Sequence, residues 1–254
     1  MLRAIIAAVA AVAAAVCTPA RALDTLSPGA LRVCLFPDFP PVVEMTADGV
    51  WRGEDVAFLR RFAESQGLAF VPVLIESFSG IWRRPGAGEC DLAASGITRT
   101  EARMAETPDA VWSTPYRATA RSLLVRVEDA PVDGVEALAG RRILTVLDST
   151  AHGDLTRRAA AAGVTVEIVG SEGEQASARA VAAGEAFGFA LGEVSALPLA
   201  AADPSLTVTW LHPFLAEDGS EGVDEFSFIS RKASTGLPEA VDAWIAAEKD
   251  AYGR

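Results

Sequence analysis

Residues that bind metals, phosphates or nucleic acids are scarce in this sequence. It has 2 His and 3 Cys, and their spacing matches no metal-binding set. It has 22 Lys and Arg against 34 Asp and Glu, a net charge of −12, and such a chain is repelled by nucleic acid and by anionic membrane surfaces. No Ser-His-Asp pattern and no glycine-rich phosphate loop is present. The sequence therefore predicts no nucleic-acid partner, no metal and no cofactor.

Long apolar runs are confined to the N-terminus. Residues 1–22 contain an early Arg3, an apolar run from Ala4 to Val16, and a small-x-small end that is typical of a signal-peptidase site. This segment is too short to span a membrane and remain there. We therefore expect a signal peptide over 1–22 and export to the periplasm. Cys17 leaves a lipid anchor open, although Val16 is unlike the small residue that precedes a lipid-modified cysteine.

Only two cysteines follow the expected cleavage site, Cys34 and Cys90. An even number of cysteines in an oxidising compartment favours a disulfide between them. The alternative is two buried thiols, because sequence does not show how far apart their Cα atoms lie.

Half of the whole sequence is hydrophobic, and after the N-terminal run short apolar segments alternate with amphipathic ones. Residues 31–36 and 69–74 have the composition of strands, and Asp55 begins a helical pattern between them. A third strand is expected at 92–94. This order predicts the α/β class, with a parallel sheet covered by helices. Ligands of such sheets bind at the carboxyl ends of the strands, where Phe39, Phe78 and Ser95 are expected.

The stretch 90–103 gives the strongest indication of a binding site. A short apolar strand is followed by a polar loop with Ser95, Gly96 and Thr98, and Arg103 comes one helical turn later. Backbone N–H groups, hydroxyls and a guanidinium suit a carboxylate, which Arg can hold by two parallel hydrogen bonds. In isolation, the same residues would be explained more simply by a capped surface helix with a solvated Arg.

This stretch resembles the ligand loop of the family 3 periplasmic solute-binding proteins of the polar amino-acid-binding type. W-S-T-P-Y at 112–116 is similar to the family's F-S-x-P-Y, and L-A-G-R-R-I-L-T-V at 138–146 is similar to L-x-G-K-x-V-x-V. The resemblance implies two Rossmann-like α/β lobes joined by two crossing segments. Lobe 1 would comprise 23–120 plus 225–254, and lobe 2 would comprise 121–224. It also implies that the strands of Cys34 and Cys90 are neighbours.

The resemblance also implies a set of ligand contacts. Ser95, Gly96, Thr98 and Arg103 would hold the ligand's carboxylate, and Thr150 would do so from a helix start whose free N–H groups favour anions. The ring of Phe39, which precedes a Pro, would stack on the ligand, and Phe78 would line the same cleft. For Phe39 and Phe78 the alternative is core packing, and for Thr150 it is a plain helix cap. A lone His152 in a polar loop is more often solvent-facing.

One departure from the family pattern concerns the ligand's ammonium group. Gly192 stands where these proteins usually carry an acid, and Glu193 follows it. A step of one residue along a strand turns a side chain to the other face, so Glu193 replaces the acid only if the register shifts. Glu174 or Gln175 at a helix start could also meet an ammonium. The sequence thus predicts a small carboxylate ligand, with an amino acid favoured and a keto or hydroxy acid left open.

The expected function is that of a monomeric receptor which delivers its solute to an inner-membrane ABC permease, and not that of an enzyme. Two alternatives remain open. Periplasmic cyclohexadienyl dehydratases resemble these receptors, and such an enzyme would need Glu174, Glu193 or His152 as its acid or base. A sensor or an accessory protein of a quinoprotein dehydrogenase is the other alternative, although such accessory proteins commonly lack the Arg that is present here at 103.

Overall fold

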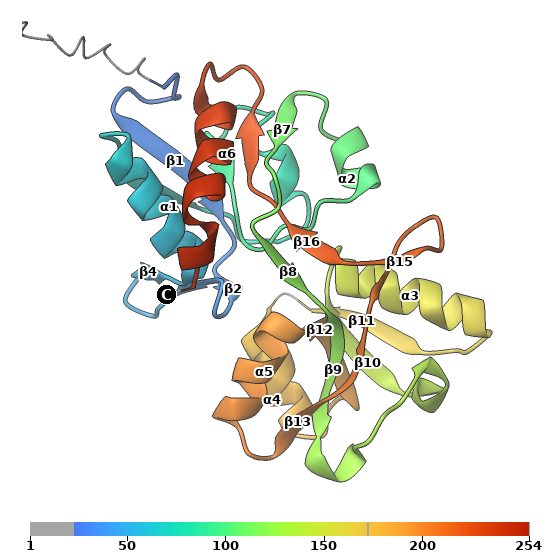
Figure 1. Ribbon diagram of the computed structural model, residues 1–254. Coiled ribbons are helices and arrows are strands. Elements are labelled where there is room, and N and C mark those ends of the chain that lie inside the picture. The colour runs from blue at the N-terminus through green and yellow to red at the C-terminus, as the bar shows by residue number, and fades with distance from the viewer. Residues whose placement is uncertain (1–22, 172, 254) are drawn as a thin grey trace, which may run out of the picture.

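The computed structural model describes residues 23–171 and 173–253 (Figure 1). The predictions of a signal peptide over 1–22 and of a lipid at Cys17 lie outside the described residues. Within the described ranges, none of the helices has the length and apolar character needed to cross a membrane.

Two α/β lobes make up the structure, each built on a five-stranded sheet (Figure 1). In lobe 1, β1 pairs in parallel with β5 and β6, and β17 is antiparallel to β6 and β7. The strand order across the sheet is β5 (Ala69–Leu74), β1 (Ala30–Leu35), β6 (Leu92–Ala93), β17 (Ile229–Arg231) and β7 (Ala110–Trp112). The helices of this lobe are α1 (Glu54–Ser65), α2 (Glu101–Ala105) and α6 (Leu237–Glu248).

Lobe 2 repeats this arrangement. There, β10 pairs in parallel with β11 and β12, whereas β9 is antiparallel to β12 and β13. The order is β11 (Glu167–Ser171), β10 (Arg142–Val146), β12 (Gly188–Gly192), β9 (Arg121–Arg126) and β13 (Leu206–His212). The helices are α3 (Thr150–Ala162), α4 (Glu174–Ala182) and α5 (Glu193–Ala202). The α/β class with two lobes is therefore confirmed.

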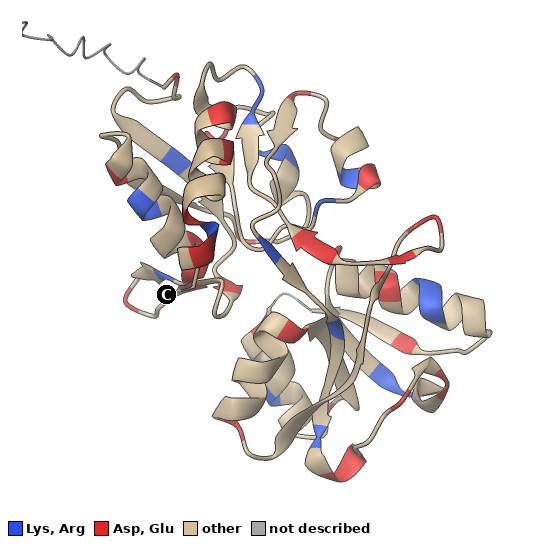
Figure 2. Ribbon diagram, in the orientation of Figure 1, with Lys and Arg blue, Asp and Glu red and all other residues tan. Residues whose placement is uncertain are grey.

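Two strands cross between the lobes and pair with each other. They are β8 (Arg117–Thr119) and β16 (Asp224–Phe226), which run antiparallel. Only Ala120 separates β8 from β9, so the chain enters lobe 2 at this point and returns along β16. Figure 2 shows that the acidic β16 lies beside basic residues of β8 and β9 where the lobes meet. Short hairpins complete the fold: β2 (Asp38–Phe39), β3 (Val43–Met45) and β4 (Trp51–Arg52), and β14 (Phe214–Leu215) with β15 (Glu221–Gly222).

Helix α1 packs on the lobe 1 sheet through the face that its sequence predicts. Val56, Leu59 and Phe62 are buried, as expected for apolar residues spaced at the helical period. The helix is capped by Gly53 at φ +120°, where a Cβ atom would clash with the backbone of Val42. Glycine is therefore required there. Asp55, the second residue of the helix, does not cap it and is buried inside the protein.

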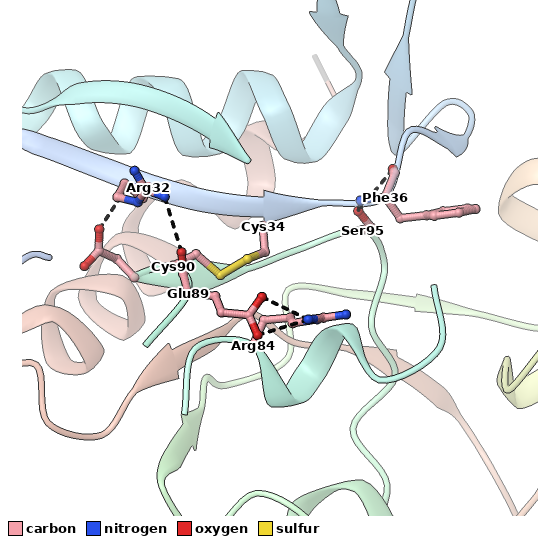
Figure 3. Close-up of a disulfide and its surroundings, with 8 residues drawn as sticks. Arg32, Cys34, Phe36, Arg84, Glu89, Cys90 and Ser95 are labelled. Atoms are coloured by element: carbon pink, nitrogen blue, oxygen red, sulfur yellow. Dashed lines mark hydrogen bonds and ion pairs between the residues drawn. A yellow bond between two sulfur atoms is a disulfide. The ribbon is translucent and has the colours of Figure 1, made fainter. Parts of the chain in front are cut away.

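The structure joins Cys34 and Cys90 in a disulfide (Figure 3). Its Sγ–Sγ distance is 1.97 Å and its Cα–Cα distance is 5.8 Å. Cys34 lies in β1 and Cys90 just before β6, which are paired neighbours in the sheet. The bridge therefore fixes β6, and the loop after it, to the first strand of the chain.

Candidate functional site

A cavity of about 50 Å³ lies between the lobes and is lined by both. Its walls follow the carboxyl ends of β1, β6, β10 and β12, the usual ligand position in open α/β sheets. Much of the wall is aromatic, formed by Phe36, Phe39, Phe78, Phe189 and Phe226. Such a mostly apolar cavity with a few polar groups has the character of a small-molecule site.

Five of the predicted ligand residues line this cavity: Phe39, Phe78, Gly96, Thr98 and Thr150. Gly96 has φ +58°, and a Cβ atom on it would collide with the ring of Phe39. The glycine thus lets the ring lie directly on the loop. Across the cleft, the hydroxyl oxygens of Thr98 and Thr150 are 3.2 Å apart. The lobes are therefore in contact at the point where these two threonines would meet a carboxylate.

Ser95 does not line the cavity. Its N–H and that of Gly96 both donate to Asp55 Oδ2, at 2.8 and 3.1 Å. The Ser95 hydroxyl accepts from the N–H of Phe36 at 2.9 Å (Figure 3). The sequence predicts that these N–H groups meet the ligand, whereas in this structure a buried carboxylate of lobe 1 accepts from both of them.

The Arg103 side chain lies beside the cavity wall and bonds to backbone carbonyls. Its guanidinium donates to the carbonyls of Thr98, at 3.0 Å, and Asp148, at 2.8 Å. It stacks 4.3 Å from the ring centroid of Trp82 and faces an adjoining groove of about 490 Å³ that also contains His152. Burial lowers the pKa of Arg103 to about 10, so the side chain remains charged at neutral pH. Arg103 therefore lies behind Thr98 and Thr150, beside the cavity and not in it.

Glu193 lies outside the cavity as well. Strand β12 ends at Gly192, which lines the cavity, and Glu193 begins α5. The Glu193 side chain lies in a separate groove beside His212, because one step along the chain reverses the direction of a strand side chain. At Gly192, an added Cβ atom would lie 3.1 Å from Arg121 Nη2. Glu193 therefore does not take over the place of the missing acid.

Sequence reasoning missed a buried ion pair on the crossing strands. The Arg121 guanidinium is paired with the carboxylate of Asp224, and the two side chains are 6% and 0% exposed. Arg121 Nη1 donates to Thr150 Oγ1 at 3.2 Å, and Thr150 Oγ1 donates to Asp224 Oδ2 at 3.1 Å. Arg121 lines the cavity. Among the described residues, Arg121 Nε and Asp224 Oδ1 have no hydrogen-bond partner. The available signal in the sequence was a charged residue next to each expected crossing segment, Arg121 before Ser122 and Asp224 before Glu225.

Two carboxylates from opposite lobes line another part of the cavity wall, Asp38 and Glu174. Asp38 Oδ2 lies against Gly173, the residue that precedes α4, where an added Cβ atom would collide with it. Glu174 is 5% exposed. Burial raises the pKa of Asp38, and it raises the pKa of Glu174 well above its ordinary value, with a further contribution from Asp38. Asp38 Oδ1 and Glu174 Oε2 have no partner within 23–171 and 173–253. No group of three His, Cys, Asp or Glu side chains in these ranges could hold a metal ion.

Comparisons with solved structures agree on the fold. An ancestral arginine-binding protein bound to arginine superposes with a TM-score of 0.75 at 20% identity, covering 87% of this chain and 93% of that one. The amino acid ABC transporter substrate-binding protein AbpA from Streptococcus pneumoniae, bound to L-arginine, gives 0.76 at 23% identity, with coverages of 88% and 90%. The ancestral amino acid-binding protein AncCDT-1, a precursor of cyclohexadienyl dehydratase, gives 0.72 at 21% identity, with coverages of 87% and 90%.

A comparison with curated protein sequences finds no match. The family model of the bacterial extracellular solute-binding proteins, family 3, matches residues 31–251. That range includes both lobes, both crossing strands and the cavity between them. The chain therefore belongs to the family 3 bacterial extracellular solute-binding proteins.

Proposed function

We propose that the chain is a periplasmic receptor that captures a small amino acid between its lobes and delivers it to an inner-membrane ABC permease. The observation that carries this proposal is the cavity, which both lobes line and whose wall includes charged side chains of both signs, each with one buried atom that has no partner among the described residues. Arg121 offers an N–H donor, and Asp38 and Glu174 each offer an acceptor. A zwitterionic amino acid would supply a carboxylate and an ammonium group, which complement these charges.

The ligand would stabilise the closed arrangement of the lobes by binding to both of them. Its carboxylate would enter between Thr98 and Thr150, next to the N-terminus of α3, where free N–H groups favour an anion. Arg103 lies directly behind these threonines, and its two recorded hydrogen bonds go to carbonyls. Turning from the Asp148 carbonyl to the ligand would replace a neutral acceptor by a charged one, which forms a stronger hydrogen bond.

The size of the cavity points to a small ligand. A volume of about 50 Å³ is small beside the roughly 300–1,000 Å³ of pockets that bind drug-sized ligands. Glycine or alanine fits this closed geometry, whereas the arginine found in two of the similar structures would require the lobes to move apart. We therefore propose a small amino acid as the ligand. We also propose that the protein meets the permease as a monomer.

A thermal-shift screen of residues 23–254 against amino acids, keto acids and dicarboxylates tests this function. A ligand at about one hundred times its Kd adds about 2.7 kcal/mol to the free energy of unfolding, which raises the melting temperature measurably. We expect small amino acids to raise the melting temperature. We expect Arg103→Ala to weaken their binding at least tenfold and so to reduce this shift. Arg99→Ala, at an exposed position of the same loop, should leave the shift unchanged. Absence of a shift with every compound would contradict the proposal.

An enzyme of the cyclohexadienyl dehydratase type is the second candidate. The observation in its favour is Glu174, a buried carboxyl with a raised pKa that faces the cavity, since such a group suits a general acid. The cavity volume argues against it, because a six-membered ring bearing a carboxylate is larger than the space available. We therefore propose that the chain has no catalytic activity, and turnover of a cyclohexadienyl acid by the purified protein would overturn this.

A further inference from the structure

We propose that Asp38 and Glu174 together form the subsite for the ligand's ammonium group and replace the acid that is missing at Gly192. This inference rests on the proposed function and makes its ligand class specific, namely a small acid that bears a primary amine. The subsite is assembled only when the lobes are closed, because Asp38 belongs to the β2 hairpin of lobe 1 and Glu174 begins α4 of lobe 2.

The geometry brings the two carboxylates to one part of the cavity wall. Asp38 reaches the start of α4, where its Oδ2 lies against the Cα of Gly173. Close approach is possible because residue 173 is glycine, where a Cβ atom would collide with Asp38 Oδ2. The other Asp38 oxygen, Oδ1, and Glu174 Oε2 have no partner among the residues described. Two unpaired acceptors therefore lie together in a buried place, which is costly unless a donor arrives.

The position beside Gly192 cannot serve an ammonium in this chain. Arg121 Nη2 lies 3.1 Å from where a Cβ atom of residue 192 would be. An ammonium placed there would meet a guanidinium, and like charges at such a distance repel each other strongly in a buried site. Its pairing with Asp224 holds the guanidinium in this position. The ammonium subsite must therefore lie elsewhere, and the unpartnered acceptors of Asp38 and Glu174 provide it.

Charge also favours an amine at this place. Two carboxylates that share a buried site resist being ionised together, and burial already raises the pKa of each. Among the neighbouring charges, Arg121 lowers the pKa of Glu174 and Arg179 lowers that of Asp38. An ammonium between the carboxylates would add a charge that favours both ionised forms. Binding of an amine should therefore release a proton from Glu174.

Matched pairs of acids with and without the amine test the subsite by titration calorimetry. The pairs are glycine with acetate and L-alanine with propionate, which differ only in the ammonium group. We expect glycine and L-alanine to bind at least tenfold more tightly than their amine-free partners. Titrations in phosphate and in Tris, whose ionisation enthalpies differ, should show release of a proton on binding of the amino acids.

Three variants locate the subsite. Glu174→Gln and Asp38→Asn keep the shape of the side chain, and each should weaken binding of L-alanine at least tenfold. Glu174→Gln should also abolish the proton release. Glu193→Gln tests the position next to Gly192 and should bind L-alanine as the unaltered protein does, since Glu193 lies in a different groove.

The outcomes separate this inference from the proposed function. Equal or tighter binding of acetate and propionate would overturn the ammonium subsite while leaving a carboxylate receptor. Loss of binding in Glu193→Gln, with normal binding in Glu174→Gln and Asp38→Asn, would overturn it in favour of the family's usual position. Failure of every amino acid to bind the unaltered protein would overturn both the inference and the function on which it rests.

Discussion

Asp55 and Glu174 are two buried carboxylates in the first turn of a helix, and both lie next to the cavity wall. Asp55 is 0% exposed and Glu174 is 5% exposed, yet their surroundings differ. Asp55 accepts from the N–H groups of Ser95 and Gly96 and from the hydroxyls of Tyr116, at 3.0 Å, and Tyr252, at 2.6 Å. Glu174 has no comparable set of donors, and its Oε2 has no partner among the described residues.

This difference separates a structural carboxylate from one that is available to a ligand. Buried polar groups are almost always hydrogen-bonded in folded proteins, and a fully bonded carboxylate such as Asp55 holds the loop at Gly96 in place from behind. A carboxylate with an unpaired oxygen on a cavity wall destabilises the empty protein. In the proposed ammonium subsite, Glu174 would gain its missing partner from the amine of the ligand. The pair of Arg121 and Asp224 is intermediate, since each of its charges is compensated and each still has one unpaired atom.

The largest expected loss of stability comes from removing one member of the buried ion pair. Asp224→Ala would leave the Arg121 guanidinium buried without its acid, which costs about 3–5 kcal/mol. Urea denaturation should show this as a lower midpoint. Glu225→Ala on the same strand is the matched control, because that side chain is exposed. Equal stabilities for the two variants would show that Arg121 is compensated by another group.

Asp55→Ala should reduce stability by about 3 kcal/mol. Four donors would lose their acceptor, and each buried donor left unpaired costs about 1–3 kcal/mol before water or rearrangement compensates. The comparison variant is Glu64→Ala, an exposed position on the same helix, which should change the free energy of unfolding very little. If Asp55→Ala were as stable as Glu64→Ala, the contrast between Asp55 and Glu174 would fail.

Glu174→Gln should alter how stability depends on pH. The folded-state pKa of Glu174 lies well above its ordinary 4.5, so the folded protein keeps a proton that the unfolded chain loses. The free energy of unfolding therefore falls as pH rises from 4.5 towards the raised pKa, by at most about 1.4 kcal/mol per pH unit. In Glu174→Gln this part of the decline should disappear, whereas the exposed control Glu185→Gln should retain it. Denaturation curves at several pH values measure the effect, and identical profiles for the two variants would contradict it.

The smallest expected effect is that of Gly192→Ala. Gly192 has an ordinary φ of −77°, so alanine causes no backbone strain there. Its Cβ atom would lie 3.1 Å from Arg121 Nη2, which pairing with Asp224 prevents from moving freely. Overpacking of this kind costs about 1 kcal/mol. Gly222→Ala, where an added Cβ meets no atom within 4 Å, is the control. A neutral Gly192→Ala would show that Arg121 can shift and that the place beside it is open to a side chain.

The order of strands and helices along the chain predicted a parallel sheet covered by helices, and the resemblance to the family implied two lobes with a cleft between them. Hydrophobic periodicity fixes the buried face of an element locally, as in α1, where Val56, Leu59 and Phe62 all lie in the core. The resemblance to the family, and not periodicity, pointed to Phe39, Gly96, Thr98 and Thr150, which all line the cavity. Helix α5 was not predicted, since Pro198 lies within it and its residues show no clear apolar face.

What only the tertiary structure decided is which distant groups compete for the same partners. The Ser95 N–H is a plausible ligand donor in sequence, but Asp55, which is 40 residues away in the chain, already accepts from it. Arg103 has its predicted place in α2, yet a carbonyl of lobe 2 receives its hydrogen bond. Glu174 lies on the cavity wall. Glu193 does not, because β12 ends at Gly192 and Glu193 is the first residue of α5. Sequence determines the local conformation and the buried faces, whereas hydrogen-bond partners and unpaired charges depend on elements that meet only when the chain folds.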